Sequence, residues 1–319
     1  MRLTFAPMEG VTSAVFRRVH RDFFPEADLY YTPFIAPDSK GSFKSSLLRA
    51  ILPENNCGIP LVPQFLVNNA EVFLSVARQA ADLGYEEVNL NLGCPSATVV
   101  SKNKGSGQLR DLPALDALLA DIFSRSPVAI SVKSRLGFSS PDEIDALMAI
   151  YRQYLIRELI LHARDREGYY KSQPDWDAFS RALCGAPFPV TYNGNIFTVD
   201  DYASLRRRFP TLDAVMLGRG AAANPALFRL LHGGEPLSLS EFRSFHVALC
   251  QAYAASGLSP HYTASRMKEH WYYFISLFSD CTRPYKALLK ARDTDELSAR
   301  ASLLFETCPF DGSAGFRQS

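Results

Sequence analysis

Residues 88–96 read Val-Asn-Leu-Asn-Leu-Gly-Cys-Pro-Ser, a short and largely apolar run that passes straight into a turn. A run of this length, bounded by turn residues, is typical of a parallel strand that is buried on both faces. Helical patterns lie on either side of it: Asn69 can cap a helix that ends near Gly84, and another helix begins near Pro113. The stretch therefore predicts one unit of an alternating β/α fold.

The same alternation extends over residues 1–235. Short β-rich runs, most of them near-continuous apolar segments, are separated by helical patterns throughout this part of the chain. The predicted strands are residues 3–6, 29–32, 61–65, 88–92, 128–133, 159–162, 190–192 and 214–217. Repeated units of this kind favour a closed (β/α)8 barrel over an open sheet.

The chain changes character at residues 232–236, His-Gly-Gly-Glu-Pro, a run of helix breakers that predicts a linker. Beyond it no strand pattern is convincing, and helical periodicity covers residues 239–256, 260–279 and 294–306. We therefore predict an α/β protein with a TIM barrel in residues 1–235 and a C-terminal helical domain in residues 236–319. We expect a frayed tail over residues 311–319.

The composition is that of an ordinary globular protein. The 319 residues are 47% hydrophobic, enough for one large barrel and a smaller appendage. No run approaches the ~18 apolar residues of a membrane span, and the first residues lack a signal-peptide pattern, so we expect a cytoplasmic protein without membrane contact. The net charge of +1 assigns no partner, so contact with nucleic acid would depend on local basic clusters.

The 6 cysteines contain no C-x-x-C pair, and their spacing suits neither a zinc site nor a disulfide framework. We therefore expect reduced thiols and no metal.

Polar residues, glycine and proline repeatedly follow the predicted strands. In a barrel the carboxyl ends of the strands converge on one face, where active sites are built. The segments in question are Ala-Pro-Met-Glu-Gly at 6–10, Gln64, Asn-Leu-Gly-Cys-Pro at 91–95, Lys-Ser-Arg-Leu-Gly at 133–137, His-Ala-Arg at 162–164, Asn-Gly-Asn at 193–195 and Gly-Arg-Gly at 218–220. They predict a single site at that face.

A phosphate group is the first ligand that this pattern predicts. Gly194 and Gly218 follow the seventh and eighth predicted strands, where barrels of this kind usually hold phosphate. Glycine lets backbone N–H groups approach a ligand closely, and the helix after Gly220 offers its N-terminus to an anion. Arg219 can add a charge-assisted hydrogen bond.

A flavin-like ring is the second ligand that this pattern predicts. Lys133 and His162 end apolar strands, where a charge without a partner would be costly. A cation beneath an electron-accepting ring would stabilise the negative charge of reduced flavin. Gln64 can both donate and accept hydrogen bonds, as an imide edge requires. Each residue alone could be structural, and it is their convergence on one face that favours a binding site.

Cys94 lies between Gly93 and Pro95, so its thiol is displayed on a turn. A lone cysteine is more commonly a small buried hydrophobe. Because no basic residue lies next to it in the sequence, a protonated thiol that acts as an acid is at least as consistent with the sequence as a nucleophile.

In order and spacing these segments resemble those of the tRNA-dihydrouridine synthases, over the whole barrel. The resemblance implies bound FMN, reduction by NADPH, and reduction of the uracil C5–C6 double bond in tRNA. The residues it implies along the flavin are Pro7, Met8, Glu9, Gln64, Lys133 and His162, and those at the phosphate end are Asn193, Gly194, Asn195, Gly218 and Arg219. Cys94 resembles the family's proton donor to uracil C5, and Asn91 the residue that helps to position the base.

Some positions depart from the family's usual pattern. Asn195 stands where Asp is usual, Ala163 where Gly is common, and Thr32 and Pro33 at an acidic position. Gln108 lies in a loop that is usually richer in small residues. None of these changes removes a mechanistic part, but they affect the detailed substrate contacts.

Contact with tRNA would rely on local clusters. Basic residues gather at 17–21, 102–104, 164–171 and 266–268, and aromatic pairs or runs at 169–170 and 271–273. The loop 102–107 contains glycine and follows Cys94, so we expect a mobile lid, with Lys104 and Arg164 as substrate contacts. Residues 271–274 are better explained as core packing, and 206–208 as a solvated helix end.

Two alternatives stay open. The first is an FMN barrel reductase that acts on a free pyrimidine or another small molecule, such as a dihydroorotate type. The second is a non-catalytic RNA-binding barrel. We expect a monomer in either case.

Overall fold

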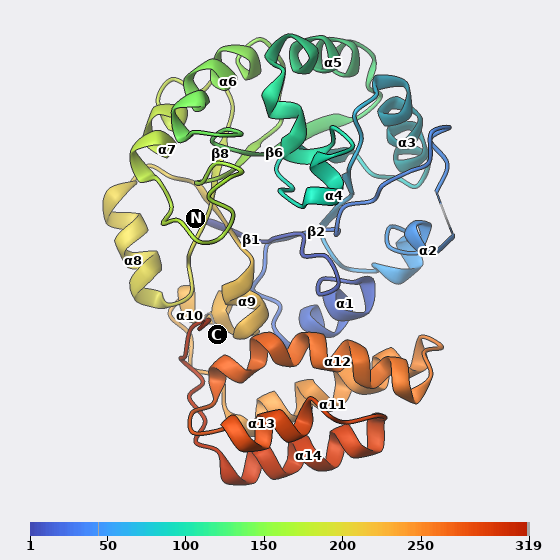
Figure 1. The fold of residues 1–319 in the computed structure, drawn as a ribbon, viewed down its shortest axis with the longest axis vertical. Helices are drawn as coiled ribbons and strands as arrows, with labels where there is room; N and C mark the ends of the chain where they lie inside the picture. The colour runs from blue at the N-terminus through green and yellow to red at the C-terminus, as the bar shows by residue number, and fades with distance from the viewer. Residues whose placement is uncertain (44, 318–319) are drawn as a thin grey trace. The chain divides into compact units, whose positions relative to one another are not determined.

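The computed structural model describes residues 1–43 and 45–317 (Figure 1). Within them, nine short parallel strands form one sheet in the order β3-β2-β1-β9-β8-β7-β6-β5-β4. The strands are β1 (Arg2–Phe5), β2 (Leu29–Tyr31), β3 (Leu61–Val62), β4 (Gln64–Phe65), β5 (Glu87–Asn91), β6 (Ala129–Arg135), β7 (Leu159–His162), β8 (Val190–Asn193) and β9 (Ala214–Leu217).

Pro63 alone separates β3 from β4, because proline has no N–H for the ladder. On one side of it Val62 pairs with Tyr31 of β2, and on the other Gln64 pairs with Asn89 of β5. The segment 61–65 therefore joins both ends of the sheet and closes it. The predicted parallel barrel is confirmed, with each expected strand within a few residues of its place.

The helices occupy the connections between strands and the C-terminal part of the chain. They are α1 (Ala14–Phe23), α2 (Ser45–Leu48), α3 (Ala70–Asp82), α4 (Ala97–Val100), α5 (Leu112–Arg125), α6 (Ile144–Tyr151), α7 (Trp176–Leu183), α8 (Val199–Arg208), α9 (Arg219–Ala223), α10 (Leu227–Leu231), α11 (Leu239–Ala255), α12 (Pro260–Phe274), α13 (Thr282–Leu288) and α14 (Thr294–Thr307). Short 3-10 turns are η1 (Pro53–Asn55), η2 (Gly105–Arg110), η3 (Pro141–Glu143) and η4 (Ile275–Leu277).

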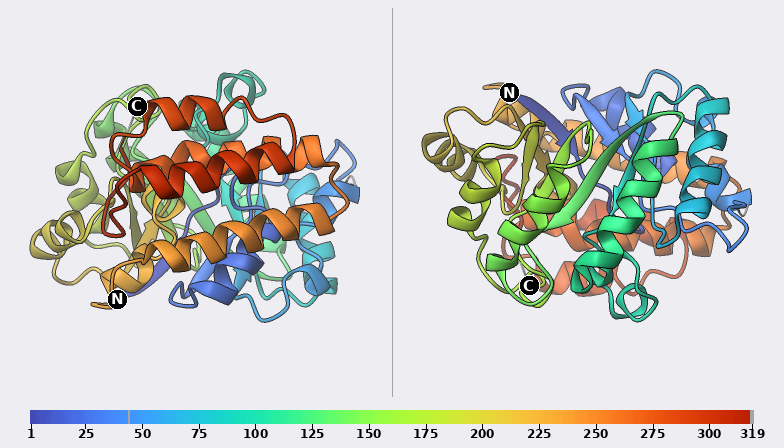
Figure 2. Two further views of the ribbon diagram at one scale, coloured as in Figure 1. Left: turned by 90° about the horizontal axis from the view of Figure 1, so that it is seen from below. Right: turned by 90° about the horizontal axis from the view of Figure 1, so that it is seen from above.

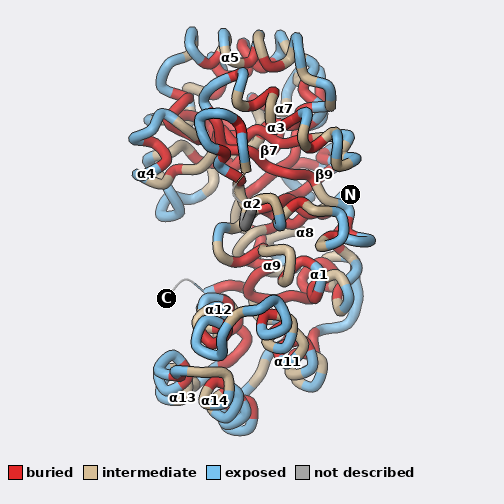
Figure 3. Tube along the Cα trace, turned by 90° about the vertical axis from the view of Figure 1, so that its right-hand side faces the viewer, coloured by how far each residue is buried: buried red, intermediate tan, exposed pale blue. Residues whose placement is uncertain are grey.

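Local sequence explains where several helices begin and end. The side chain of Asn69 accepts the N–H of Val72 at 3.0 Å at the start of α3, and Gly84 follows its end with a φ of 87°. Ser140 and Glu143 form a capping box before α6. Along α5, buried and exposed residues alternate with the helical period (Figure 3), as in a helix that covers a barrel.

The chain packs as two compact units. The first comprises residues 1–7, 29–194 and 211–216, which contain the strands and helices α2 to α7. The second comprises residues 8–28, 195–210 and 217–319, with α1 and α8 to α14. Because α1 and α8 to α10 belong to the same unit as the C-terminal helices, the two units do not correspond to two continuous halves of the chain. The domain boundary between residues 235 and 236 stays a prediction.

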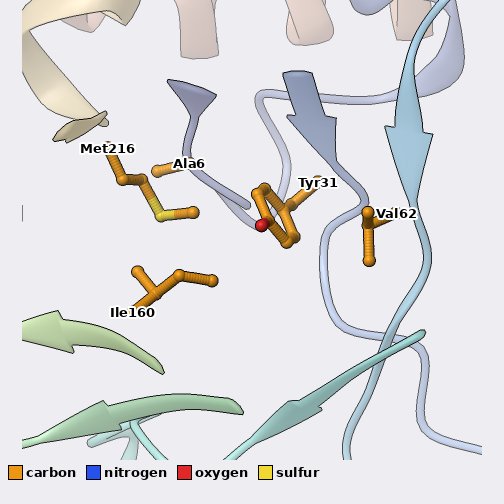
Figure 4. Close-up of a cluster of buried hydrophobic side chains, with 5 residues drawn as sticks. All are labelled: Ala6, Tyr31, Val62, Ile160 and Met216. Carbon is orange, nitrogen blue, oxygen red and sulfur yellow. The ribbon is translucent and has the colours of Figure 1, made fainter. Parts of the chain in front are cut away.

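An apolar cluster fills one side of the barrel interior in the first unit (Figure 4). Its members come from β2, β3, β7 and β9 and from the residue that follows β1. They are Ala6, Tyr31, Val62, Ile160 and Met216, each 5% exposed or less. Such layers of inward side chains are expected inside a closed parallel barrel.

In the second unit, the helices of residues 239–307 run beside one another (Figure 2, left, orange to red). Trp271 is fully buried in their core and donates its ring N–H to His246 Nε2 at 3.0 Å. The core-packing interpretation of residues 271–274 is therefore confirmed for Trp271 and Phe274, which are fully buried, whereas Tyr272 is exposed. His20, His246 and His270 are also buried, and desolvation lowers their pKa values to about 3, 4 and 3 respectively.

The C-terminal part differs from the sequence analysis in two ways. The sequence pattern did not predict α13. The tail is also packed rather than frayed as far as Arg317, because Phe316 buries its ring. Arg317 donates its N–H to Ser276 Oγ at 3.1 Å and a guanidinium N–H to the carbonyl of Phe278 at 2.9 Å. The last two residues of the predicted tail, 318 and 319, lie outside the described part of the chain.

Candidate active site

A row of amide side chains crosses three adjacent strands of the first unit. Gln64 of β4, Asn89 of β5 and Ser131 of β6 are register neighbours and fully buried. Gln64 Nε2 donates to Asn89 Oδ1 at 2.8 Å, and Asn89 Nδ2 donates to Ser131 Oγ at 2.9 Å. On the same face of β5, two residues after Asn89, Asn91 Nδ2 donates to Gln64 Oε1 at 2.7 Å. The row therefore links the barrel interior to the carboxyl end of β5.

Cys94 lies on the turn that this row reaches, and its side chain is half-buried. Asn91 Oδ1 accepts the backbone N–H groups of Gly93 at 3.1 Å and of Cys94 at 2.9 Å. From the other side Ser106 donates its N–H at 3.1 Å and its hydroxyl at 2.9 Å to the carbonyl of Cys94. Both backbone polar groups of Cys94 are thus held in place.

Packing of residues 105–109 corrects the predicted lid. They form most of η2 and are buried, and a Cβ at Gly105, whose φ is 55°, would lie 2.8 Å from the carbonyl oxygen of Cys94. This half of the loop is a support for the cysteine turn, so a mobile lid over 102–107 is wrong there. Lys102 is exposed and Lys104 is half-buried. Burial lowers the pKa of Lys104, and the charge of Lys102 lowers it further.

Lys133 of β6 is half-buried at the same end of the barrel, and its Nζ donates to Asn193 Oδ1 at 2.8 Å. Asn193 in turn donates to the carbonyl of Met216 at 2.9 Å. Desolvation, reinforced by Arg135 and partly offset by Cys94, lowers the Lys133 pKa to about 7. A lysine in this setting is poised between its charged and neutral forms.

Lys133 and Arg135 supply the basic neighbours that the sequence around Cys94 lacks. Both interact electrostatically with the cysteine, because Asn91 and Lys133 are register partners on adjacent strands. Only strand pairing brings these residues together. The expectation of a thiol without basic neighbours is therefore wrong in space, although it is right along the chain.

Arg135 is a site residue that sequence reasoning missed. Its Nε donates to the carbonyl of Gly93 at 2.8 Å, and its Nη1 to the carbonyls of Asp165 at 2.8 Å and Tyr169 at 3.2 Å. It therefore ties the cysteine turn to the loop after β7. Its position two residues after Lys133, and so on the same face of β6, was the available signal.

His162 and the tyrosines after it lie at the end of β7. His162 is buried, and its ring meets the ring of Tyr170 edge-on at 5.9 Å. Tyr169 and Tyr170 are 41% and 40% exposed, so they are accessible aromatics. Arg164 is buried and donates from Nε to the carbonyl of Ser172 at 2.7 Å, which anchors this loop. Its substrate contact stays a prediction.

The second unit holds Met8, Glu9, Asn195, Gly218 and Arg219, which are also predicted at the cofactor. Met8 and Glu9 belong to a turn in which the Met8 carbonyl accepts the N–H of Thr12 at 3.0 Å, and Gly10 has a φ of 76°. Glu9 is exposed. Pro7, the residue before this turn, is half-buried and belongs to the first unit.

Arg219 is held tightly within the second unit. Its Nη2 donates to Asn195 Oδ1 at 2.8 Å, and its guanidinium lies 5.3 Å from the ring centres of both Phe197 and Phe316. Because the side chain of Asn195 is neutral, this hydrogen bond does not compensate the charge of Arg219. Gly218 precedes α9, but this helix begins at Arg219 and spans one turn, so the expected helix-dipole contribution is small.

Several predicted RNA contacts are buried or engaged. In the 17–21 cluster Arg17 donates to the carbonyl of Thr12 at 2.7 Å, and His20 contacts the carbonyl of Pro225 at 2.9 Å, so neither faces solvent. Arg266 pairs with Glu269 at 2.8 Å. The expectation that residues 206–208 form a solvated helix end is confirmed, since all three are exposed.

No helix among the described residues is long and apolar enough to span a membrane. Within residues 1–43 and 45–317, no group of three His, Cys, Asp or Glu side chains could hold a metal ion.

Comparison with solved structures shows the fold. The old yellow enzyme from Trypanosoma cruzi matches with a TM-score of 0.52 at 11% identity, over 74% of this chain and 89% of that one, which shows the shared barrel fold. The family match that follows places this barrel among the flavin-dependent oxidoreductases.

The family model for dihydrouridine synthase (Dus) matches residues 4–273, so the chain belongs to this family. The tRNA-dihydrouridine(16) synthase of Aquipseudomonas alcaligenes is 26% identical over 95% of this chain and 99% of its own length. The tRNA-dihydrouridine(16) synthase of Salmonella typhimurium is 32% identical over 74% of this chain and 78% of its own.

Proposed function

We propose that this protein is a tRNA-dihydrouridine synthase that reduces the C5–C6 double bond of a uridine in tRNA, with FMN as cofactor and NADPH as reductant. The observation that carries the proposal is Cys94, whose backbone is fixed from both sides beside the cations of Lys133 and Arg135. Membership of the dihydrouridine synthase family and the names of the relatives support it.

The donor set at the strand ends fits a flavin. Gln64 and Asn91 offer amide groups, and Lys133 offers a cation whose pKa is lowered by desolvation and by the charge of Arg135. An anionic ring edge placed there would be stabilised. His162 would lie near the ring, Pro7, Met8 and Glu9 along it, and the phosphate would be held by Asn193, Gly194, Asn195, Gly218 and Arg219. When bound and reduced, FMN supplies the hydride that uracil C6 receives.

Cys94 would supply the proton to uracil C5. The S–H bond breaks as the C5–H bond forms, and the thiolate that remains is stabilised by Lys133 and Arg135. Lys133, with a pKa of about 7, can return a proton to the sulfur at neutral pH. The cations of Lys133 and Arg135 thus favour the acid role over an inert thiol.

Asn91 would orient both the acid and the base. Its oxygen is used by the N–H groups of Gly93 and Cys94, and one N–H by Gln64, which leaves the second N–H of the amide for the uracil. Such contact requires a base that has left its stack. Tyr169 and Tyr170 offer accessible rings, and Lys102 and Lys104 offer cations for the RNA backbone. The helical domain of residues 236–319 would carry further tRNA contacts.

The test compares Cys94→Ala with the wild type on unmodified tRNA. We expect the variant to retain FMN and its reduction by NADPH, and to lose dihydrouridine formation by about 100-fold or more, because only the proton donor is missing. Cys57→Ala, at an exposed cysteine, is the matched control and should keep full activity.

Other outcomes would overturn the proposal. Full activity of Cys94→Ala would reject the acid role. Turnover of free uridine but not of tRNA would support a small-molecule reductase instead. Protein that is colourless and does not retain added FMN would support a non-catalytic RNA-binding barrel.

A further inference from the structure

The amide row beneath Cys94 has a direction. Cys94 N–H donates to Asn91, Asn91 to Gln64, Gln64 to Asn89, and Asn89 to Ser131. Every side chain accepts from the side of the cysteine and donates away from it. Aligned hydrogen bonds of this kind polarise one another and are stronger together than apart.

The chemistry of the two ends fixes this direction. At one end the backbone N–H groups of Gly93 and Cys94 can only donate. At the other end Ser131 makes a hydrogen bond to Glu87: burial raises the pKa of that carboxyl, and the bond from Ser131 lowers it, as a donated hydroxyl does. The hydroxyl proton of Ser131 therefore points to Glu87, and its oxygen is left to accept from Asn89.

Asn89 is the central element of the row. Its Oδ1 accepts from Gln64 Nε2, so the amide of Gln64 must turn its oxygen towards Asn91. That in turn sets the Asn91 oxygen towards the turn of Cys94. An apolar residue at position 89 would remove the acceptor of Gln64 Nε2, so a buried N–H would lose its partner and Gln64 would be held from the side of Asn91 alone.

The row is also unusual because its polar side chains lie in the barrel interior. Inward layers of a parallel barrel are dominated by Val, Ile and Leu, whereas Gln64, Asn89 and Ser131 are polar and fully buried. A buried amide that lost its partners would be destabilising. Their retention here as a connected set indicates a role that burial alone would not require.

We propose that Asn89 is a positioning residue that holds Cys94 in place for proton donation, acting through Gln64 and Asn91. The inference rests on the proposed acid role of Cys94. Asn89 itself touches neither the thiol nor the reacting atoms, since its side chain bonds to Gln64 and Ser131.

The test is Asn89→Leu in the full-length holoenzyme, assayed on unmodified tRNA. We expect kcat to fall by about 10-fold or more while KM for tRNA stays within about 2-fold, because the acid is misplaced but RNA binding is not. FMN content and the rate of flavin reduction by NADPH should be unchanged. The rate of Cys94 alkylation by iodoacetamide, followed peptide by peptide in the mass spectrometer, should also change.

Asn89→Asp is the rescue variant. A carboxylate at position 89 still accepts from Gln64, so kcat should return to within about 3-fold of the wild type. Ser131→Ala, which disturbs only the far end of the row, should show the same pattern with a smaller loss, and it provides a readout if Asn89→Leu does not fold. Asn56→Leu removes a buried amide elsewhere in the first unit, whose Nδ2 donates to the carbonyls of Ala50 and Leu52, and should leave kcat unchanged.

Three results would overturn the inference. The first is an unchanged kcat in both Asn89→Leu and Ser131→Ala. The second is a loss of activity that follows a loss of FMN, and the third is a rise in KM alone. Failure of the proposed function is distinguishable, because in that case Cys94→Ala would itself stay active, whereas failure of this inference requires an inactive Cys94→Ala beside an active Asn89→Leu.

Discussion

On the side of the barrel interior formed by β1, β2, β3, β7 and β9, apolar side chains converge on one another (Figure 4), whereas on β4, β5 and β6 the inward positions carry amides, a serine and a lysine. The first set is held by burial, which has no direction. The second is held by hydrogen bonds, whose donors and acceptors must match. One side can therefore tolerate changes of shape that keep the volume, while the other must keep a pattern of donors and acceptors.

The comparison also separates stability from function. Polar side chains that are fully connected specify one arrangement, because every alternative leaves a buried group unsatisfied. The polar side leads to Cys94 and Lys133, the residues to which we assign chemistry, and the apolar side leads to neither. Variants on the two sides should consequently fail in different ways.

The largest expected effect on stability is that of Ile160→Ala, in the apolar cluster. Removing a fully buried Ile side chain should lower the free energy of unfolding by about 2–5 kcal/mol, through lost burial and the cavity that remains. Urea unfolding measures it, with Ile160→Val as the graded control at about 0.5–1.5 kcal/mol. If Ile160→Ala lowers the free energy of unfolding no more than Ile160→Val does, the apolar side of the barrel is not tightly packed.

Lys133→Met should reveal a pH dependence that belongs to the polar side. The folded pKa of Lys133, about 7, lies below the ordinary lysine value of 10.5, so between these pH values the unfolded chain binds more protons. The stability of the wild type should therefore rise with pH from about 7 to 10.5 relative to that of the variant. Below pH 7 the difference between the two proteins should be flat.

The measurement is urea unfolding of both proteins without FMN across this pH range, with the lysine side-chain pKa followed by NMR. A Lys133 that titrates near its ordinary value, with parallel pH profiles for the two proteins, would contradict the prediction. Added FMN should raise the Lys133 pKa if an anionic group binds beside it.

The smallest effect is expected for Tyr31→Phe, at the border between the two kinds of packing. The ring lies in the apolar cluster, while its hydroxyl donates to Glu158 Oε2 at 3.1 Å. Glu158 keeps its contacts with Arg2 and Thr191, so the variant should lose only about 0.5–1.5 kcal/mol. Thermal unfolding measures the loss. A value in the range expected for Ile160→Ala would mean that the hydroxyl, and not the ring, secures this side.

Local signals in the sequence predicted most of the fold. Apolar runs and the helix starts at Asn69 and Ser140 placed the strands and several helices, because caps and periodicity act within a few residues. The glycine- and proline-containing segments after the strands predicted a site at the carboxyl end of the barrel, and this stays a prediction. The sequence pattern missed α13 and the packed tail, since Phe316 finds its partners Phe197 and Tyr273 far away along the chain.

The sequence by itself determined the parallel barrel, the family resemblance and the display of Cys94 on a turn, all of which depend on neighbours within one segment. Only the tertiary structure decided which charges and amides surround that cysteine. Lys133 and Arg135 reach it because β5 and β6 pair in one register, and Asn89 meets Gln64 and Ser131 for the same reason. A shift of one residue in that pairing would turn these side chains to the opposite face, and no local pattern encodes the choice.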